Sequence, residues 1–116
     1  IAYLNASRVL RSIHASNKDE EIGIEIIRVA LTAPLMQILE NAGVRNKHAI
    51  LNALLNSRDT DYGYNVKTNN FENFYKSGVI DPVKVSRVAL ENAASVGAMF
   101  LTTECGIVDY QPLPQK

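Results

Sequence analysis

The sequence predicts a mainly α-helical protein: a helical bundle with a short strand or hairpin near residues 62–66 and an extended strand near the C-terminus. Apolar residues recur at intervals of three and four through most of the chain. The 116 residues are 47% hydrophobic and 21% charged, which is ordinary for one globular domain. No repeat or low-complexity tract divides them, so we expect a single domain over 1–116.

The first two helices are predicted on either side of a polar interruption. Near-helical spacing of apolar residues marks the first helix, and the polar run 16–20 ends it; the apolar residues are Leu4, Val9, Leu10 and Ile13. Asn17 is a good N-cap, and Glu20 three residues later completes an asparagine variant of the capping box. A second helix should begin near Lys18, with its apolar stripe at Ile22, Ile26, Val29, Ala30 and Ala33.

Pro34 decides how the second helix continues. Proline lacks a backbone donor and clashes with the preceding turn, so residues 35–42 form either a kinked continuation or a new helix. Gly43 is expected in the left-handed conformation that ends a helix. Asn46 then opens a third helix that runs through Leu55.

A turn-rich region follows the third helix. Residues 56–70 are dense in Asn, Asp, Ser and Gly, which favour turns. Tyr62–Val66 has the alternation of a short strand or hairpin edge. Asn70–Lys76 is predicted to form a short helix that Gly78 ends.

A long final helix has the clearest start signal. Asp81 suits the N-cap, and Pro82 has the φ angle of a first helical residue. The helical period continues to about Thr103, and the Ala- and Val-rich composition predicts close packing on several sides. The extended segment Cys105–Tyr110 follows, and Pro112 and Pro114 would end any strand there.

Charge and chain ends exclude several classes of function. Lys and Arg number 12, as do Asp and Glu, so no net charge favours nucleic acid. The first residues have neither a basic region nor a long apolar core, so we expect no signal peptide and no membrane span there. The missing initiator Met hints at a fragment or a processed chain. The single cysteine suits a reducing compartment.

Motifs for catalysis or metal binding fail on spacing. His14 and His48 have no Cys or carboxylate partner at ligand spacing, so no zinc site is expected. Asp59–Gly63 resembles the start of a calcium loop, but its glycine is fifth instead of sixth and Asn70 stands at the twelfth position. Cys105 has no neighbouring His or cation, and no glycine-rich phosphate loop is present. By motif alone this is no enzyme.

Several short motifs together resemble the C-terminal end of group I chaperonins, the GroEL family. They occur in the family's order and spacing over nearly the whole chain: Gly23-Ile, Ala33-Pro-Leu-x-Gln-Ile38, Tyr62-Gly-Tyr-Asn65, Ser77-Gly-Val-Ile-Asp-Pro-Val-Lys-Val85, Ala93-Ala-Ser-Val-Gly97 and Leu101-Thr-Thr-Glu-Cys105. The resemblance implies that 1–116 is a single partial domain, the C-terminal half of the equatorial domain that binds ATP and builds the ring.

The resemblance also implies a nucleotide site. Asn65, Val66 and Lys67 match the segment that lines the adenine base, and Val79 matches an apolar contact to its face. Asp81 matches the carboxylate that accepts from the ribose hydroxyls. The family commonly has Asn-Ala-Ala at 65–67, so the base contacts of Val66 and Lys67 should be looser or made by backbone. Without the resemblance, Asp81 is a plain N-cap and Asn65 a turn residue.

A subunit interface and an incomplete catalytic site are implied as well. Cys105, Gly106, Ile107 and Val108 match the strand that pairs with a hairpin of the neighbouring subunit. ATP with Mg would be the cofactor of the full-length parent, but the family's phosphate loop and hydrolytic Asp are not in this sequence. We therefore expect the fragment not to hydrolyse ATP alone. Met36 and Arg45 replace the Arg and Glu used for ring-to-ring contacts in bacterial members. The resemblance therefore does not decide between a single and a double ring, or a double ring uses other contacts.

The implied partners are other subunits of a homo-oligomeric ring, a co-chaperonin and unfolded client proteins, while the fragment itself should self-associate. The alternative is a free-standing helical interaction module that derives from a chaperonin and lacks ATPase activity. The tail 110–116 lacks the Gly-Gly-Met repeats of many bacterial members. A mitochondrial matrix or plastid is therefore favoured, with a bacterial cytoplasm as the alternative.

Overall fold

A computed structural model of the chain describes residues 1–109. The chain divides into two compact units, Ile1–Val83 and a second that begins at Lys84, and each is described by itself. The predicted fold class is confirmed, because helices dominate and the strands form one two-stranded antiparallel hairpin in the described residues.

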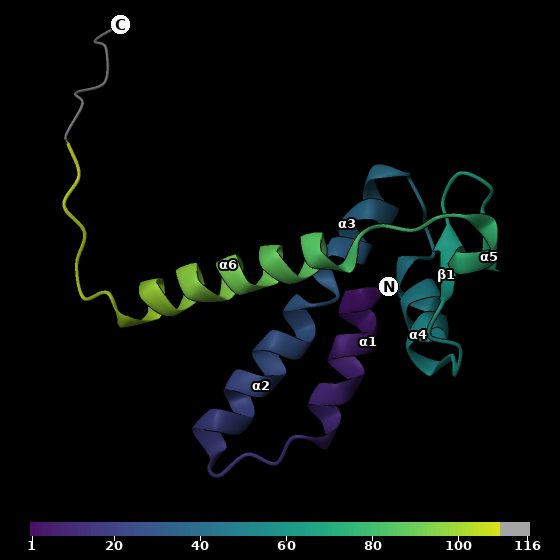
Figure 1. The fold of residues 1–116 in the computed structure, drawn as a ribbon. Helices are drawn as coiled ribbons and strands as arrows, with labels where there is room; N and C mark the ends of the chain where they lie inside the picture. The colour runs from purple at the N-terminus through teal and green to yellow at the C-terminus, as the bar shows by residue number, and fades with distance from the viewer. Residues whose placement is uncertain (110–116) are drawn as a thin grey trace, which may run out of the picture. The chain divides into compact units, whose positions relative to one another are not determined.

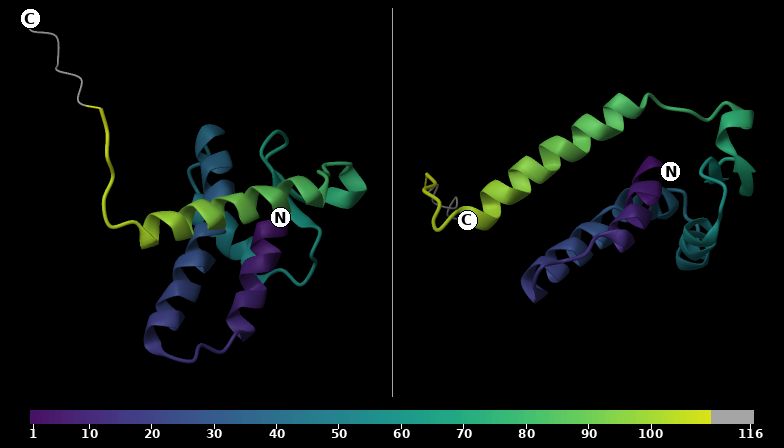
Figure 2. Two further views of the ribbon diagram at one scale, coloured as in Figure 1. Left: turned by 60° about the vertical axis from the view of Figure 1, so that its left-hand side comes forward. Right: turned by 60° about the horizontal axis from the view of Figure 1, so that its bottom comes forward.

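The first unit begins with helices joined by short connections (Figure 1). They are α1 (Ala2–Val9), the 3₁₀ turn η1 (Leu10–Ser12), α2 (Lys18–Ala30), α3 (Ala33–Asn41) and α4 (Lys47–Asn56). The views in Figures 1 and 2 agree that α1 and α2 lie side by side and run in opposite directions. The short connection at residues 13–17 produces this antiparallel pair.

The cap of α2 forms as its sequence predicts. The Asn17 side chain accepts a hydrogen bond from the Glu20 backbone N–H at 2.9 Å. Glu20 reaches back to the N–H of Ser16 at 2.7 Å, one residue before the partner usual in a capping box. The two bonds satisfy amides at the helix start and fix where α2 begins.

The alternatives at Pro34 are resolved in favour of a new helix. α2 ends at Ala30, and α3 starts at Ala33 with the proline in its first turn, where its missing N–H costs nothing. α3 closes at Gly43, which has a φ of 69°. The N–H of Gly43 bonds to the carbonyl of Glu40 and that of Val44 to the carbonyl of Leu39, each at 2.9 Å. This pattern is a Schellman motif, and it confirms the predicted helix end.

The hairpin pairs β1 (Tyr62–Asn65) with β2 (Asn70–Asn73), followed by the short helix α5 (Phe74–Ser77). The predicted strand at 62–66 is confirmed. The predicted helix over Asn70–Lys76 is wrong in its first half, where β2 pairs with β1 instead. The chain reverses through residues 66–69 with Asn69 at a φ of 55°, which brings Phe71 opposite Tyr64. Cross-strand pairing therefore overrides the helical pattern of 70–73.

The core of the first unit lies where α1, α3 and α4 meet. Its buried cluster consists of Leu4, Leu39, Ile50 and Leu54. Arg8 crosses from α1 and donates to the carbonyl of Leu54 in the last turn of α4, where a cation is favourable. The hairpin covers the cluster from another side, because Tyr62, Tyr64 and Val66 pack against it. The core thus fixes the hairpin relative to α4.

The second unit consists of α6 (Val83–Thr102) and the segment that follows it. The helix begins one residue after Pro82 and ends one residue before the predicted Thr103. None of its residues is buried, so the prediction of close packing on several sides is wrong for this chain. Small Ala and Val side chains permit another element to pack closely on α6, but they do not show that such an element is present in the same chain.

Residues 103–109 contain neither helix nor strand. The strand predicted at Cys105–Tyr110 needs a hydrogen-bonded neighbour, and the part of the chain that the structure describes provides none. Tyr110, Pro112 and Pro114 lie outside the described residues.

One stretch of the described residues, Lys18–Asn41, could cross a membrane by length and composition alone. It comprises α2 and α3 with the turn at residues 31–32 between them. A single stretch of this kind is weak evidence for a membrane. The absence of a membrane partner stays a prediction.

Candidate functional site

The hairpin presents two different faces, because side chains alternate along a strand. Tyr62, Tyr64 and Phe71 form an aromatic face. The Tyr62 and Phe71 rings stack with centroids 5.4 Å apart, and the Tyr64 and Phe71 rings meet edge to face at 5.1 Å. This face packs toward α4 and closes the hairpin onto the core.

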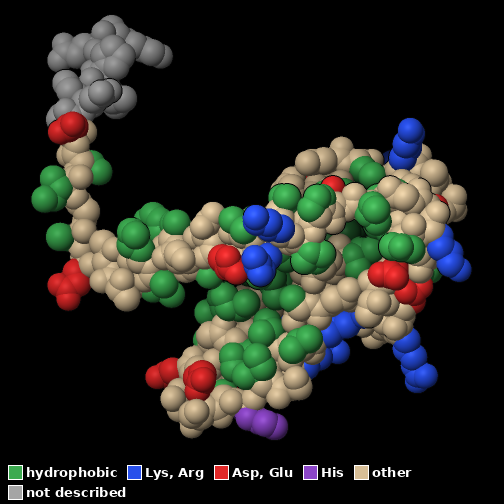
Figure 3. Space-filling view, in the orientation of Figure 1, with side chains coloured by type: hydrophobic (Ala, Val, Ile, Leu, Met, Phe, Trp, Pro, Cys, Tyr) green, Lys and Arg blue, Asp and Glu red, His purple; other side chains and the backbone are tan. Residues whose placement is uncertain are grey.

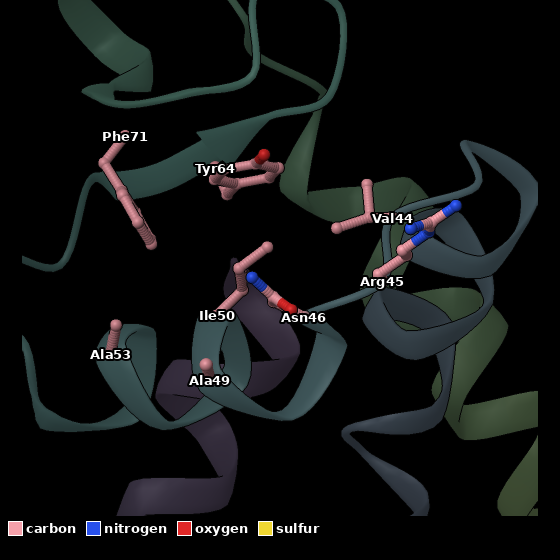
Figure 4. A pocket seen from close by; sticks show the side chains of 8 residues that line it. All are labelled: Val44, Arg45, Asn46, Ala49, Ile50, Ala53, Tyr64 and Phe71. Carbon is pink, nitrogen blue, oxygen red and sulfur yellow. The ribbon is translucent and has the colours of Figure 1, made fainter.

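An open pocket of about 370 Å³ lies between the aromatic face and the start of α4 (Figure 4). Figure 4 shows Tyr64 and Phe71 on one side and α4 residues on the other. The lining residues are Val44, Arg45, Asn46, Ala49, Ile50, Ala53, Tyr64 and Phe71. None of the residues predicted to bind nucleotide lines it.

Gly63 lies on the opposite face, where other parts of the chain approach its backbone. A Cβ atom added at Gly63 would lie 2.6 Å from two ring carbons of Phe74 and 2.8 Å from the terminal carbon of Ile1. No side chain fits there without displacing these groups. The glycine between two tyrosines is thus explained by the close approach of α5 and of the start of α1.

Asn65 lies on the same face as Gly63, and both ends of its side-chain amide are bonded. Its Oδ1 accepts from the backbone N–H of Lys67 at 3.0 Å, and its Nδ2 donates to Oε1 of Glu72 at 2.5 Å. The first bond is an Asx-turn, so the turn role of Asn65 is confirmed. The sequence did not indicate Glu72, which comes close only through strand pairing.

The two residues after Asn65 differ in environment. Val66 is partly buried and packs against the core cluster, whereas Lys67 is exposed. The Val66 side chain is therefore occupied by the core. A ligand beside Asn65 would meet the backbone of this turn and the exposed Lys67 side chain.

Val79 and Asp81 follow α5. Gly78, with a φ of 73°, ends that helix, and the N–H of Val79 bonds to the carbonyl of Phe74 at 2.9 Å. Val79 is 45% exposed, and Asp81 is exposed. The Asp81 carboxylate lies within electrostatic reach of the backbone nitrogen of Ile1. Asp81 therefore lies near the start of α1.

Phe74 and Ile1 connect these elements. Both lie against Gly63; Phe74 also bonds through its backbone to Val79, and Ile1 lies within electrostatic reach of Asp81. The face of β1 that carries Asn65 is therefore the face toward α5 and the segment after it. The aromatic pocket lies on the other face.

Asp59 closes the base of the hairpin. Its two carboxylate oxygens accept from the Asp61 backbone N–H at 2.9 Å and from the Asn73 side chain at 3.0 Å. These bonds hold the pKa of Asp59 below its usual value, the backbone bond most strongly. No cluster of three or more metal-ligating side chains occurs among residues 1–109. The Asp59 carboxylate thus serves the turn.

A broader hollow of about 900 Å³ lies between η1 with its following loop and α2. Apolar side chains gather over α1 and α2 in the space-filling view (Figure 3). Ile22, Ile26 and Val29 of α2 are each more than half exposed. The apolar face of α2 is thus open in this chain.

The residues predicted at a subunit interface are all exposed. They are Cys105, Gly106, Ile107 and Val108, and Cys105 is a free thiol. Ile107 is 99% exposed. Within the described residues this segment is therefore open to solvent along its whole length.

Comparison with known proteins covers both units. Residues 2–111 match the model of the TCP-1/cpn60 chaperonin family. The chain is 49% identical over 109 residues to the chaperonin GroEL of Mycoplasmoides gallisepticum. The match covers 94% of this chain and 20% of that relative, so the chain spans about a fifth of the relative's length. The chain therefore belongs to the TCP-1/cpn60 chaperonin family, as a fragment of a group I chaperonin.

Proposed function

We propose that this chain supplies the adenine and ribose contacts of the ATP site in a chaperonin that assists protein folding. Asn65 and the backbone at Val66 and Lys67 contact the base edge, Val79 its face, and Asp81 the ribose hydroxyls. An amide offers both a donor and an acceptor to a base, and a carboxylate can accept from two hydroxyls. These donors and acceptors suit a nucleoside.

The observation that carries the proposal is the family match over 2–111, which spans Asn65, Val79 and Asp81. The geometry supports it. Asn65 lies on the face of β1 that Phe74 covers, and the Phe74 carbonyl accepts a hydrogen bond from the Val79 N–H, so Val79 follows on the same side of the hairpin. The exposed Val79 and Asp81 leave an apolar and an anionic group free for a ligand. We assign the phosphate and magnesium contacts to other parts of the full-length protein, as the resemblance to group I chaperonins implies.

The partners and the compartment are proposals as well. We assign to Cys105–Val108 the pairing with a neighbouring subunit, because an exposed segment with free backbone groups suits strand addition. Ring formation, a co-chaperonin and unfolded clients are proposed for the full-length protein. A mitochondrial matrix or plastid stays the predicted compartment; the bacterial source of the 49% identical relative adds weight to a bacterial cytoplasm.

The ribose contact gives a direct test in the complete protein that carries this chain. Calorimetry would compare ADP with 2′-deoxyADP for the wild type and for Asp81→Ala. A hydrogen bond to a charged acceptor is worth about tenfold in affinity. We expect the wild type to prefer ADP by about that factor, and Asp81→Ala to bind both nucleotides equally.

Asp19→Ala is the matched control, since Asp19 is an exposed aspartate in the first turn of α2. It should keep the preference of the wild type. If the Asp81→Ala protein still prefers ADP, Asp81 does not contact the ribose. A wild type that binds neither nucleotide would overturn the proposed function.

The alternative function, a helical interaction module without ATPase activity, is favoured by one observation. The apolar face of α2 is open, with Ile26 61% exposed. Such a face suits a protein partner. Under this alternative the protein would bind no adenine nucleotide, whereas substitutions on α2 would abolish partner binding.

A further inference from the structure

We propose that Glu72 is a positioning residue that fixes the orientation of the Asn65 amide, so that Asn65 selects adenine over guanine. The inference rests on the proposed function, because it requires Asn65 to contact the base. It adds a residue that neither the sequence pattern nor the resemblance indicated.

The strand register explains why Glu72 reaches Asn65. Glu72 lies directly opposite Gly63, and Asn65 lies opposite Asn70. Because Gly63 has no side chain, Glu72 has no direct cross-strand side chain to pack against. Its carboxylate extends to the diagonal neighbour Asn65 and accepts from Nδ2 at 2.5 Å. The glycine that admits Phe74 therefore also frees Glu72 for this contact.

Two neighbours impose the same orientation on the amide. An ionised carboxylate only accepts hydrogen bonds, so the Nδ2 group must face Glu72. A backbone N–H only donates, so Oδ1 must face Lys67, at 3.0 Å. Rotation of the amide by 180° would break both bonds and set oxygen against oxygen. The amide of Asn65 is thus fixed before any ligand arrives.

The fixed amide keeps one N–H and one oxygen lone pair for a ligand. Adenine presents a donor and an acceptor side by side, its N6 amino group and N7, which match an asparagine amide in two hydrogen bonds. Guanine presents two acceptors, O6 and N7, at the same edge. One of them would face the Asn65 oxygen, and the fixed orientation prevents the amide from turning to relieve this repulsion.

Nucleotide preference tests the inference in the complete protein. Calorimetric dissociation constants for ADP and GDP would be measured with wild type, Asn65→Ala, Glu72→Met and Glu72→Gln. Methionine has a similar length but no strong acceptor, whereas glutamine keeps an oxygen that can accept from Nδ2. Glu21→Gln is the control, an exposed glutamate on α2.

We expect the ADP preference to fall about tenfold in Asn65→Ala, the usual scale of one paired base contact. Glu72→Met should lose several-fold of the preference, and Glu72→Gln should stay within about twofold of wild type. Glu72→Met should cause no further loss in the Asn65→Ala background, because its effect passes through Asn65. If the methionine variant does not fold, Glu72→Val, a good strand former without an acceptor, replaces it.

The outcomes separate the two proposals. Loss of preference in Asn65→Ala but not in Glu72→Met overturns the positioning role and leaves the base contact in place. Equal loss in Glu72→Met and Glu72→Gln also overturns it, because the acceptor would then not matter. If the Asn65→Ala protein keeps the wild-type preference for ADP over GDP, Asn65 does not contact the base. The proposed role of Glu72 is then overturned as well.

Discussion

At the scale of single residues, two positions of one strand show how far sequence reasoning reaches. A glycine permits close approach to the backbone, and at Gly63 the groups that approach are Phe74 and Ile1 of the same chain. The identity of the neighbour was not predictable, since Phe74 lies 11 positions later in the chain and reaches Gly63 only after β1 and β2 pair. Asn65 was predictable as a turn residue, because its bond to the Lys67 N–H joins residues only two apart in the chain. Its bond to Glu72 was not predictable, because it depends on the pairing of two strands.

Gly63→Ala tests whether this close approach stabilises the fold. The added methyl group would overlap Phe74 and Ile1, so we expect the free energy of unfolding to fall by about 1–3 kcal/mol. Urea denaturation followed by circular dichroism measures the change. Gly23→Ala is the matched control, because its site in α2 is open and alanine favours a helix by about 0.5–1 kcal/mol. A Gly63→Ala protein as stable as wild type would contradict the packing at this position.

At the scale of elements, local signals predict the helix ends. The caps at Asn17 and Gly43 involve atoms within five residues of each other, so the sequence alone specifies them. Strand β2 depends instead on a partner strand. Its sequence, Asn-Phe-Glu-Asn, holds a single residue type that favours strands, and only the pairing of Phe71 with Tyr64 makes it a strand.

Two asparagine caps should differ in what they contribute. The side chain of Asn17 accepts a hydrogen bond at the start of α2, whereas Asn46 caps α4 with no side-chain bond. We therefore expect Asn17→Ala to cost about 0.5–2 kcal/mol of stability and Asn46→Ala only a few tenths. Urea denaturation of both variants would check this difference. Equal losses would show that the Asn17 bond adds nothing beyond the backbone preference of asparagine.

At the scale of the whole molecule, composition predicts that the chain folds but not how much apolar surface it leaves open. The apolar stripes of α2 and α6 were read correctly as helical, yet both remain exposed. A periodic pattern shows that a face needs a partner and does not show whether the partner is in the same chain. The chain spans about a fifth of the length of its GroEL relative, so we propose that partners outside this chain cover these faces in the full-length protein.

Exposed faces of this kind predict that the 116-residue chain self-associates on its own. Apolar patches larger than a few hundred Å² commonly mediate association. Two routes are open: the face of α2, where Ile22 and Ile26 are more than half exposed, and the segment with Ile107 and Val108. Sedimentation velocity over a range of concentrations would measure the association.

Paired variants separate the routes. Ile22→Ser with Ile26→Ser removes apolar area from α2, and Ile107→Ser with Val108→Ser removes it from the C-terminal segment while leaving α2 unchanged. Because burial of apolar area scales with the area removed from water, we expect the α2 pair to weaken association more, as α2 offers a continuous helical face. A wild-type chain that sediments as a clean monomer at high concentration would show that these faces do not drive association.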